Sequence, residues 1–150
     1  MNVIQAERAV TQWIADTCGL TVDQNIFRRN FPPSMSAGCS VTFANELTSN
    51  HPHVRMFPCQ IYGKYVTDEE AWNHISLFTE RLFPAYMQPA GDFMIISALL
   101  SGDAMVYESA DDAGTKWFIS LNCYLSIREI SPVDNIEQAT TQLLKRKVSI

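Results

Sequence analysis

The sequence predicts an α+β fold, and three patterns support that prediction. Two stretches, about residues 2–18 and 68–83, place apolar residues at helical spacing. Several shorter segments alternate apolar and polar residues, as half-buried strands do. The third pattern is a long hairpin near the C-terminus, over residues 101–127. A chain of 150 residues suits one domain, residues 1–150, and is long enough to bury a substantial core.

The first helix is amphipathic. One of its faces carries Val3, Ala6, Val10, Trp13, Ile14 and Thr17. Gly19 follows directly, and glycine readily takes the left-handed conformation found at helix ends. We therefore expect the helix to end near residue 18.

The segments after this helix read as strands and loops. Residues 25–30 form a short strand candidate, and the Pro-rich segment 31–38 is a loop. Residues 39–44 alternate, which predicts a half-buried strand. Residues 54–65 are also rich in strand-forming residues, but Pro58 interrupts them. Because proline has no N–H to donate, this strand is predicted to lie at a sheet edge or to contain a bulge.

The second helix begins with a capping box. The Thr67 hydroxyl is expected to accept a hydrogen bond from the N–H of Glu70, and the Glu70 carboxylate to reach back to the N–H of Thr67. Asp68 and Glu69 add negative charge at the positive end of the helix dipole. The apolar stripe of the helix is Ala71, Trp72, Ile75, Phe78, Leu82 and Phe83.

Histidine and carboxylate pairs in the chain raise the question of a metal site. Glu70 and His74 are four residues apart, but helical geometry directs both toward solvent, with no third ligand fixed by the sequence. His51 and His53 lie in a polar loop with no further ligand beside them. We therefore predict no metal site.

The C-terminal hairpin presents two different faces. An apolar run, residues 93–100, follows a connecting segment, residues 84–91, and fits a buried strand. The second arm of the hairpin then alternates. One face carries Trp117, Ile119, Leu121, Cys123, Leu125 and Ile127. Phe118 and Tyr124 belong to the other face, so both faces contain apolar residues.

The second face of the hairpin leaves two interpretations open. The chain's own helices could cover it, giving a sheet between helices, or it could contact another subunit. Leu77 is predicted to lie almost opposite the buried stripe of its helix. The candidate subunit-interface residues are Leu77, Phe118 and Tyr124, with Asp111 and Asp112 at the solvated hairpin tip.

Composition disfavours several classes of function. The net charge of −5 argues against nucleic acid as the main partner, because phosphate binding needs a concentrated basic face. The basic cluster at residues 145–147 fits a solvated end. No apolar run approaches the roughly 20 residues that cross a bilayer, and the N-terminus does not resemble a signal peptide.

The cysteines and the motif content do not suggest an enzyme. The four cysteines, Cys18, Cys39, Cys59 and Cys123, form no C-x-x-C pair and are predicted to be reduced core thiols of an intracellular protein. The sequence lacks a P-loop, a G-x-G-x-x-G motif and a G-x-S-x-G motif. We expect no catalytic residues and no cofactor.

Two motifs resemble those of the small tail-terminator and minor-capsid proteins of long-tailed bacteriophages. In that family a strand leads into a helix with an acidic T/S-x-E-E-A start, as at residues 66–71 here. A final hairpin ends in an alternating strand of the type W/Y-x-x-S-L-N, as at residues 117–124. The order of segments is similar over about residues 1–130.

The resemblance implies a fold and a function. The expected fold is a twisted, mostly antiparallel sheet with helices packed on it. The expected function is that of a virion protein forming a homo-oligomeric ring, typically hexameric, that caps the tail tube at its head-proximal end. Its partners would be the tail-tube protein and a head-completion or connector protein, with assembly in the bacterial cytoplasm.

Two alternatives and one segment remain open. The chain could be a small α+β ligand-binding domain or enzyme subunit, using a pocket between helix 68–83 and the sheet. It could also be another connector or head-completion protein. Residues 131–150 have no counterpart in the resemblance and are expected to form a short helix after Asp134 or a frayed end.

Overall fold

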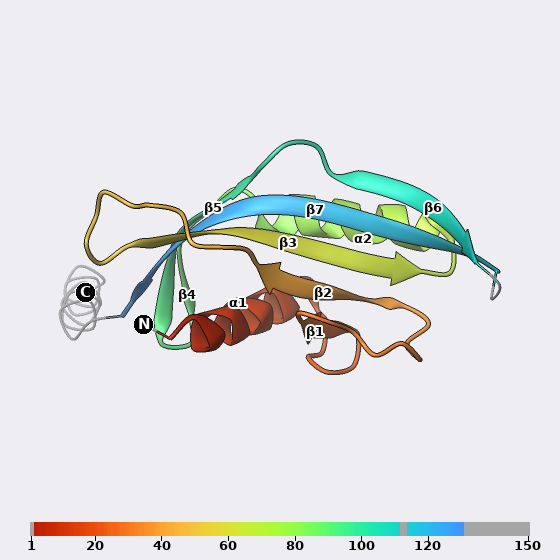
Figure 1. The fold of residues 1–150 in the computed structure, drawn as a ribbon, viewed down its shortest axis with the longest axis horizontal. Coiled ribbons are helices and arrows are strands. Elements are labelled where there is room, and N and C mark those ends of the chain that lie inside the picture. Colours follow the sequence, from red (N-terminus) through yellow and green to blue (C-terminus); the bar gives the residue numbers. More distant parts are fainter. Residues whose placement is uncertain (1, 112–113, 131–150) are drawn as a thin grey trace, which may run out of the picture.

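The computed structural model describes residues 2–111 and 114–130. These residues form two helices and seven strands (Figure 1). In chain order the elements are α1 (Val3–Cys18), β1 (Ile26–Arg28), β2 (Gly38–Phe43), β3 (Arg55–Tyr65), α2 (Asp68–Leu82), β4 (Ala85–Ala90), β5 (Phe93–Leu100), β6 (Met105–Asp111) and β7 (Gly114–Glu129). The predicted extension at residues 131–150 lies outside the described residues.

The seven strands form one twisted sheet around a long central pair, β3 and β7. The strand order is β1-β2-β3-β7-β5-β4, and β6 also pairs with β7. Because β3 occupies one edge of β7, β5 and β6 share the other, with β5 along residues 123–129 and β6 along residues 114–120. All described pairs are antiparallel except β1 with β2. The predicted α+β fold, mostly antiparallel sheet and long C-terminal hairpin are confirmed.

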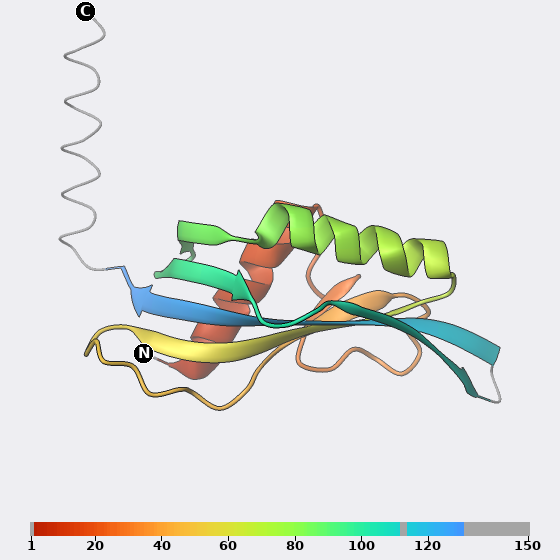
Figure 2. The same ribbon diagram turned by 90° about the horizontal axis from the view of Figure 1, so that it is seen from above.

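Both helices pack on the same face of the sheet. They contact each other, and their apolar faces join the alternate, inward-facing residues of β3 and β7 in one hydrophobic cluster. In Figure 2 α2 runs along one side of the sheet, and no helix covers the other side in the described part of the chain. In the part of the chain that the structure describes, the sheet therefore does not lie between helices.

Pro58 lies in a central strand, which contradicts the predicted edge or bulge. Strand β3 runs between β2 and β7, and Pro58 pairs in register with Tyr124. The Pro58 carbonyl accepts a hydrogen bond from the N–H of Ala44, just beyond the end of β2 (2.8 Å). In an antiparallel strand, the N–H and C=O of one residue point toward the same neighbouring strand. The position where Pro58 lacks an N–H therefore faces the end of β2 and not β7. The β3–β7 ladder therefore loses no hydrogen bond.

Two further elements differ from the sequence predictions. Residues 84–91 were expected to connect elements, but most of them form the edge strand β4 beside β5. The stripe of α2 also has different borders. Its buried members are Ala71, Ile75, Phe78 and Leu82, whereas Trp72 is 55% exposed. The buried stripe therefore extends from Ile75 toward Ala71 and Phe78, which lie on the side of Ile75 away from Trp72.

Both helix N-termini are capped by side chains. Asn2 caps α1 by accepting from the N–H of Ile4 (2.9 Å). The Thr67 hydroxyl accepts from the N–H of Glu70 (3.2 Å), as predicted. The Glu70 carboxylate accepts from the N–H of Val66 (3.3 Å) and not from that of Thr67, so the return bond lies one residue earlier than expected. At the other end of α1, Gly19 adopts the left-handed conformation, with φ of 72°.

A buried carboxylate that sequence analysis did not identify fixes α1 against the sheet. The side chain of Glu7 is 0% exposed. One of its oxygens accepts from Arg28 Nη1 (2.6 Å) and Arg29 Nε (3.0 Å), and the other accepts from the N–H of Phe43 (2.9 Å). Such partners make burial of the charge tolerable. Glu7 therefore joins α1, the end of β1 and the end of β2.

Candidate interaction surface

The sheet face opposite the helices carries large apolar side chains. We call it the open face. Strand alternation directs Phe118 and Tyr124 of β7 onto it, and the register places Leu99 beside Tyr124 and Tyr107 beside Phe118. Tyr124 is 43% exposed, and Leu99 and Tyr107 are exposed to a similar extent. Met105, on the same face, is 57% exposed. Scattered exposed apolar residues are common, but neighbours on one face form a patch typical of interaction sites.

Four aromatic rings cross the open face in a continuous row, which we call the aromatic row. Successive ring centroids are 5.9 Å apart for Phe31 and Tyr62, 5.7 Å for Tyr62 and Phe118, and 5.5 Å for Phe118 and Tyr107. Three of the rings come from neighbouring strands and the fourth from the loop after β1. Lys64 Nζ lies 5.4 Å from the centre of the Phe31 ring. These contacts give the row a fixed shape.

The row also changes the chemistry of one tyrosine. Partial burial is the main cause that raises the pKa of Tyr62, to about 12, and a hydrogen bond to Tyr107 acts in the same direction. Tyr62 is therefore a neutral phenol at physiological pH and acts as a packing and hydrogen-bonding group.

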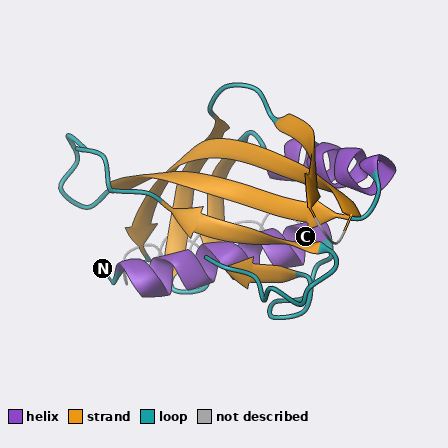
Figure 3. Cartoon of the chain, turned by 45° about the vertical axis from the view of Figure 1, so that its right-hand side comes forward, coloured by secondary structure: helices purple, strands orange, loops and turns teal. Residues whose placement is uncertain are grey.

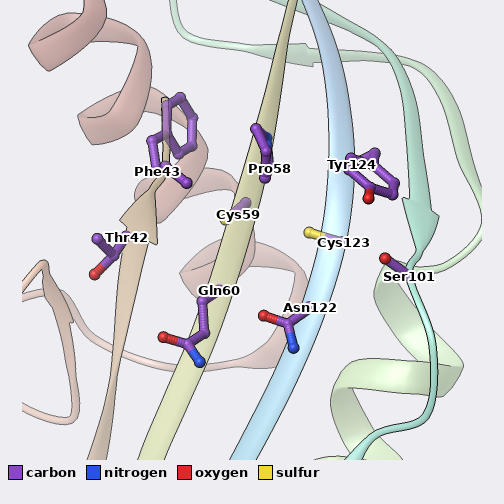
Figure 4. Close-up of a pocket in the computed structure, with 10 residues that line it drawn as sticks. Thr42, Phe43, Pro58, Cys59, Gln60, Ser101, Asn122, Cys123 and Tyr124 are labelled. Atoms are coloured by element: carbon purple, nitrogen blue, oxygen red, sulfur yellow. The ribbon is translucent and has the colours of Figure 1, made fainter. Parts of the chain in front are cut away.

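Beside the row lies a hollow of 430 Å³ lined by both polar and apolar side chains. In Figure 4 the amides of Gln60 and Asn122 lie side by side on neighbouring strands, with Thr42 and Tyr124 at its sides. Gln60 Nε2 donates to the hydroxyl of Ser120 (3.1 Å). The side chains lining this hollow carry no charge, so they can bind a polar partner by hydrogen bonds but offer no carboxylate or imidazole for acid–base chemistry.

The thiols near the hollow are poor nucleophiles. All four cysteines are free and buried, as predicted. Cys59 faces Cys123 across the β3–β7 pair, and the hydrogen bond between them, together with burial, raises the pKa of Cys59 well above its usual value. Burial raises the pKa of Cys39 to about 12 and that of Cys18 to about 11. Since the thiolate is the reactive form, these thiols are largely inert at neutral pH.

The surroundings of the histidines are typical of structural side chains. His74 was expected to face solvent, which is wrong: it is half-buried and stacks on Tyr65, with ring centroids 4.3 Å apart. Its Nδ1 lies 2.8 Å from the carbonyl oxygen of Glu70. His51 and His53 are exposed, with ring centroids 6.0 Å apart. Over residues 2–111 and 114–130, no three His, Cys, Asp or Glu side chains come together as metal ligands would.

The five predicted interface residues lie in different environments. Tyr124 lies exposed on the open face, and Phe118 is half-buried within the aromatic row. Leu77 does not face solvent as expected, because it packs partly against the hydrophobic core. Asp112 lies outside the described residues, and of Asp111 only the backbone is described, at the end of β6. The structure therefore places two of the five on the open face.

Sequence analysis missed most of the open face. Phe31, Tyr62 and Tyr107 lie in three separate segments, and only sheet register makes them neighbours of Phe118. One signal was present: Tyr62 and Lys64 alternate with Ile61 and Gly63. That alternation in residues 54–65 could have placed them on the face opposite the core.

Comparison with known proteins does not assign this chain to a family or a function. No protein-family model matches the chain, and no match was found among curated proteins. Among the described residues, neither helix has the length and apolar character to cross a membrane.

Proposed function

We propose that this chain is a structural virion protein that acts as a phage tail terminator, forming a homo-oligomeric ring that caps the tail tube and joins it to the head. The proposal begins from the sequence motifs at residues 66–71 and 117–124, which resemble those of that family. In this role the protein needs no cofactor and catalyses no reaction. Its partners are further copies of itself, the tail-tube protein and a head-completion or connector protein.

The observation that carries the proposal is the aromatic open face, which no helix covers in the part of the chain that the structure describes. A sheet with helices on one face must leave its other face in water or bury it against another molecule. Here that face holds Phe118, Tyr107 and Tyr124, together with Leu99 and Met105. Aromatic residues and methionine are enriched at protein interfaces. A surface of this kind supports assembly better than it supports catalysis.

The alternative is a small ligand-binding domain, and one observation favours it. The 430 Å³ hollow around Gln60 and Asn122 is large enough for a small polar molecule. The location proposed from the sequence, between α2 and the sheet, is filled by the buried side chains of Ala71, Ile75 and Phe78. The ligand-binding alternative therefore shifts from that location to the hollow on the open face.

Mass measurement across a concentration series tests the proposal. We expect native mass spectrometry to show monomers in dilute solution and a single closed ring, of six subunits by the family resemblance, at higher concentration. Electron microscopy should show the same ring at the ends of reconstituted tail tubes. A protein that stays monomeric at millimolar concentration and leaves tail tubes uncapped would contradict the proposal and favour the ligand-binding alternative.

A further inference from the structure

An exposed flank of α2 carries a second exposed aromatic side chain. Trp72 is 55% exposed, and Val66, just before the helix, is also exposed. Tryptophan is one of the residues that most often dominates binding energy when it is buried at an interface. We call Trp72 and the carboxylates beside it the helix patch.

The helix patch is acidic. Asp68 and Glu69 precede Trp72 by four and three residues, so they lie on the same side of the helix. Both are exposed. The patch therefore combines one large apolar ring with two negative charges.

The open face has the complementary character. Lys64 lies in register with Phe118, and Lys116 lies two residues before Phe118 on the same face of β7. The outward-facing side chains described on β3 and β6 include no carboxylate; the hairpin tip falls outside the described side chains. The aromatic row is thus bordered by two positive charges.

The two patches lie on opposite sides of the sheet. Figure 2 shows α2 along one side of the sheet. Strand alternation buries Ile119 and Leu121 under the helices and directs the aromatic row to the other side. The row therefore cannot meet the helix patch of its own chain. A second copy can supply that patch, because every copy presents both surfaces.

We propose that the helix patch of one copy docks on the aromatic row of the next copy, with Trp72 against the rings and Asp68 and Glu69 near Lys64 and Lys116. This contact rests on the proposed ring function and specifies how the ring is made. Two different patches give a heterologous, front-to-back contact, which closes into a ring when the rotation between copies divides the circle. Two copies meeting by the same patch would stop at a dimer.

A mixing experiment tests this contact. One variant, Trp72→Ala, removes the helix patch and keeps the row. The other, Lys64→Glu with Tyr107→Asp, gives the row the same charge as the helix patch and keeps Trp72. Each variant alone should need roughly 30-fold more protein to assemble than the wild type, as loss of an interface hot spot requires. Mixed one to one, they should form a heterodimer, because one intact contact remains.

Controls separate this inference from the proposed function. Ser76→Ala, on the exposed side of the same helix, should assemble as the wild type does. Circular dichroism checks that each variant folds, and Lys64→Glu alone replaces the double variant if the latter does not. Wild-type rings with unchanged assembly of Trp72→Ala, or no heterodimer in the mixture, would overturn the contact and leave the ring function standing. A wild-type protein that never forms rings would overturn both.

Discussion

The two faces of the β3–β7 pair differ in what covers them. On the inner face Ile61, Leu121 and Leu125 are almost completely buried under the helices. Figure 3 shows the sheet and the two helices. On the outer face Tyr62 and Phe118 are half-buried and stack on each other, and Tyr124 is exposed. Both faces are apolar in sequence, yet only the inner one has a covering layer in the described chain. The inner face therefore stabilises the fold, whereas no described element covers the outer face.

Helix α2 offers the strongest test of this difference, because one of its aromatic residues is buried and another is exposed. Phe78 is completely buried, and Phe78→Ala should lower the free energy of unfolding by about 3–5 kcal/mol, the usual cost of a large core cavity. The exposed Trp72, changed to alanine, should lower it by under about 1 kcal/mol. Denaturant unfolding of the monomer measures both. Equal losses would show that Trp72 is part of the fold and not of a surface.

Glu7 tests the polar part of the inner face. Glu7→Ala should lower the free energy of unfolding by about 3 kcal/mol, because it leaves the buried N–H of Phe43 and two guanidinium groups without their acceptor. Arg29→Ala is the matched control. Since the Arg29 side chain is 50% exposed, its loss should cost less than about 1 kcal/mol. The prediction is wrong if the two variants unfold at the same denaturant concentration.

The side chain of His74 lies between the buried core and solvent. Because His74 stacks on the buried Tyr65, His74→Ala should lower the free energy of unfolding by about 1 kcal/mol, as loss of an aromatic pair does. Thr67→Ala, which removes the helix cap, should cost a similar amount, about 1 kcal/mol. Thermal unfolding of both variants measures this. A negligible effect of His74→Ala would mean that the ring faces solvent, as the helical pattern first indicated.

The smallest effect on folding is expected on the outer face. Tyr124→Ser should change the free energy of unfolding by less than about 0.5 kcal/mol, because the side chain is exposed. If the open face binds another copy, the same change should still raise the concentration needed for assembly. Sedimentation velocity and denaturant unfolding of one sample give both values. A large loss of stability together with unchanged assembly would contradict the comparison of the two faces.

The sequence alone determined the elements whose signals are local. The ends of α1, the cap at Thr67 and the alternation of β7 all follow from neighbouring residues, and the structure confirms them. Local signals work here because capping and burial periodicity depend on the residues of one element. The two-sided apolar character of the final hairpin could also be read from the sequence.

Only the tertiary structure decided which surfaces remain uncovered. It placed both helices on one face, put Pro58 in a central strand, exposed Trp72 and buried Glu7. It also joined Phe31, Tyr62, Phe118 and Tyr107, which are distant in sequence, into one row. These outcomes depend on strand order and register, which the pairing of distant segments sets and which no local spacing encodes.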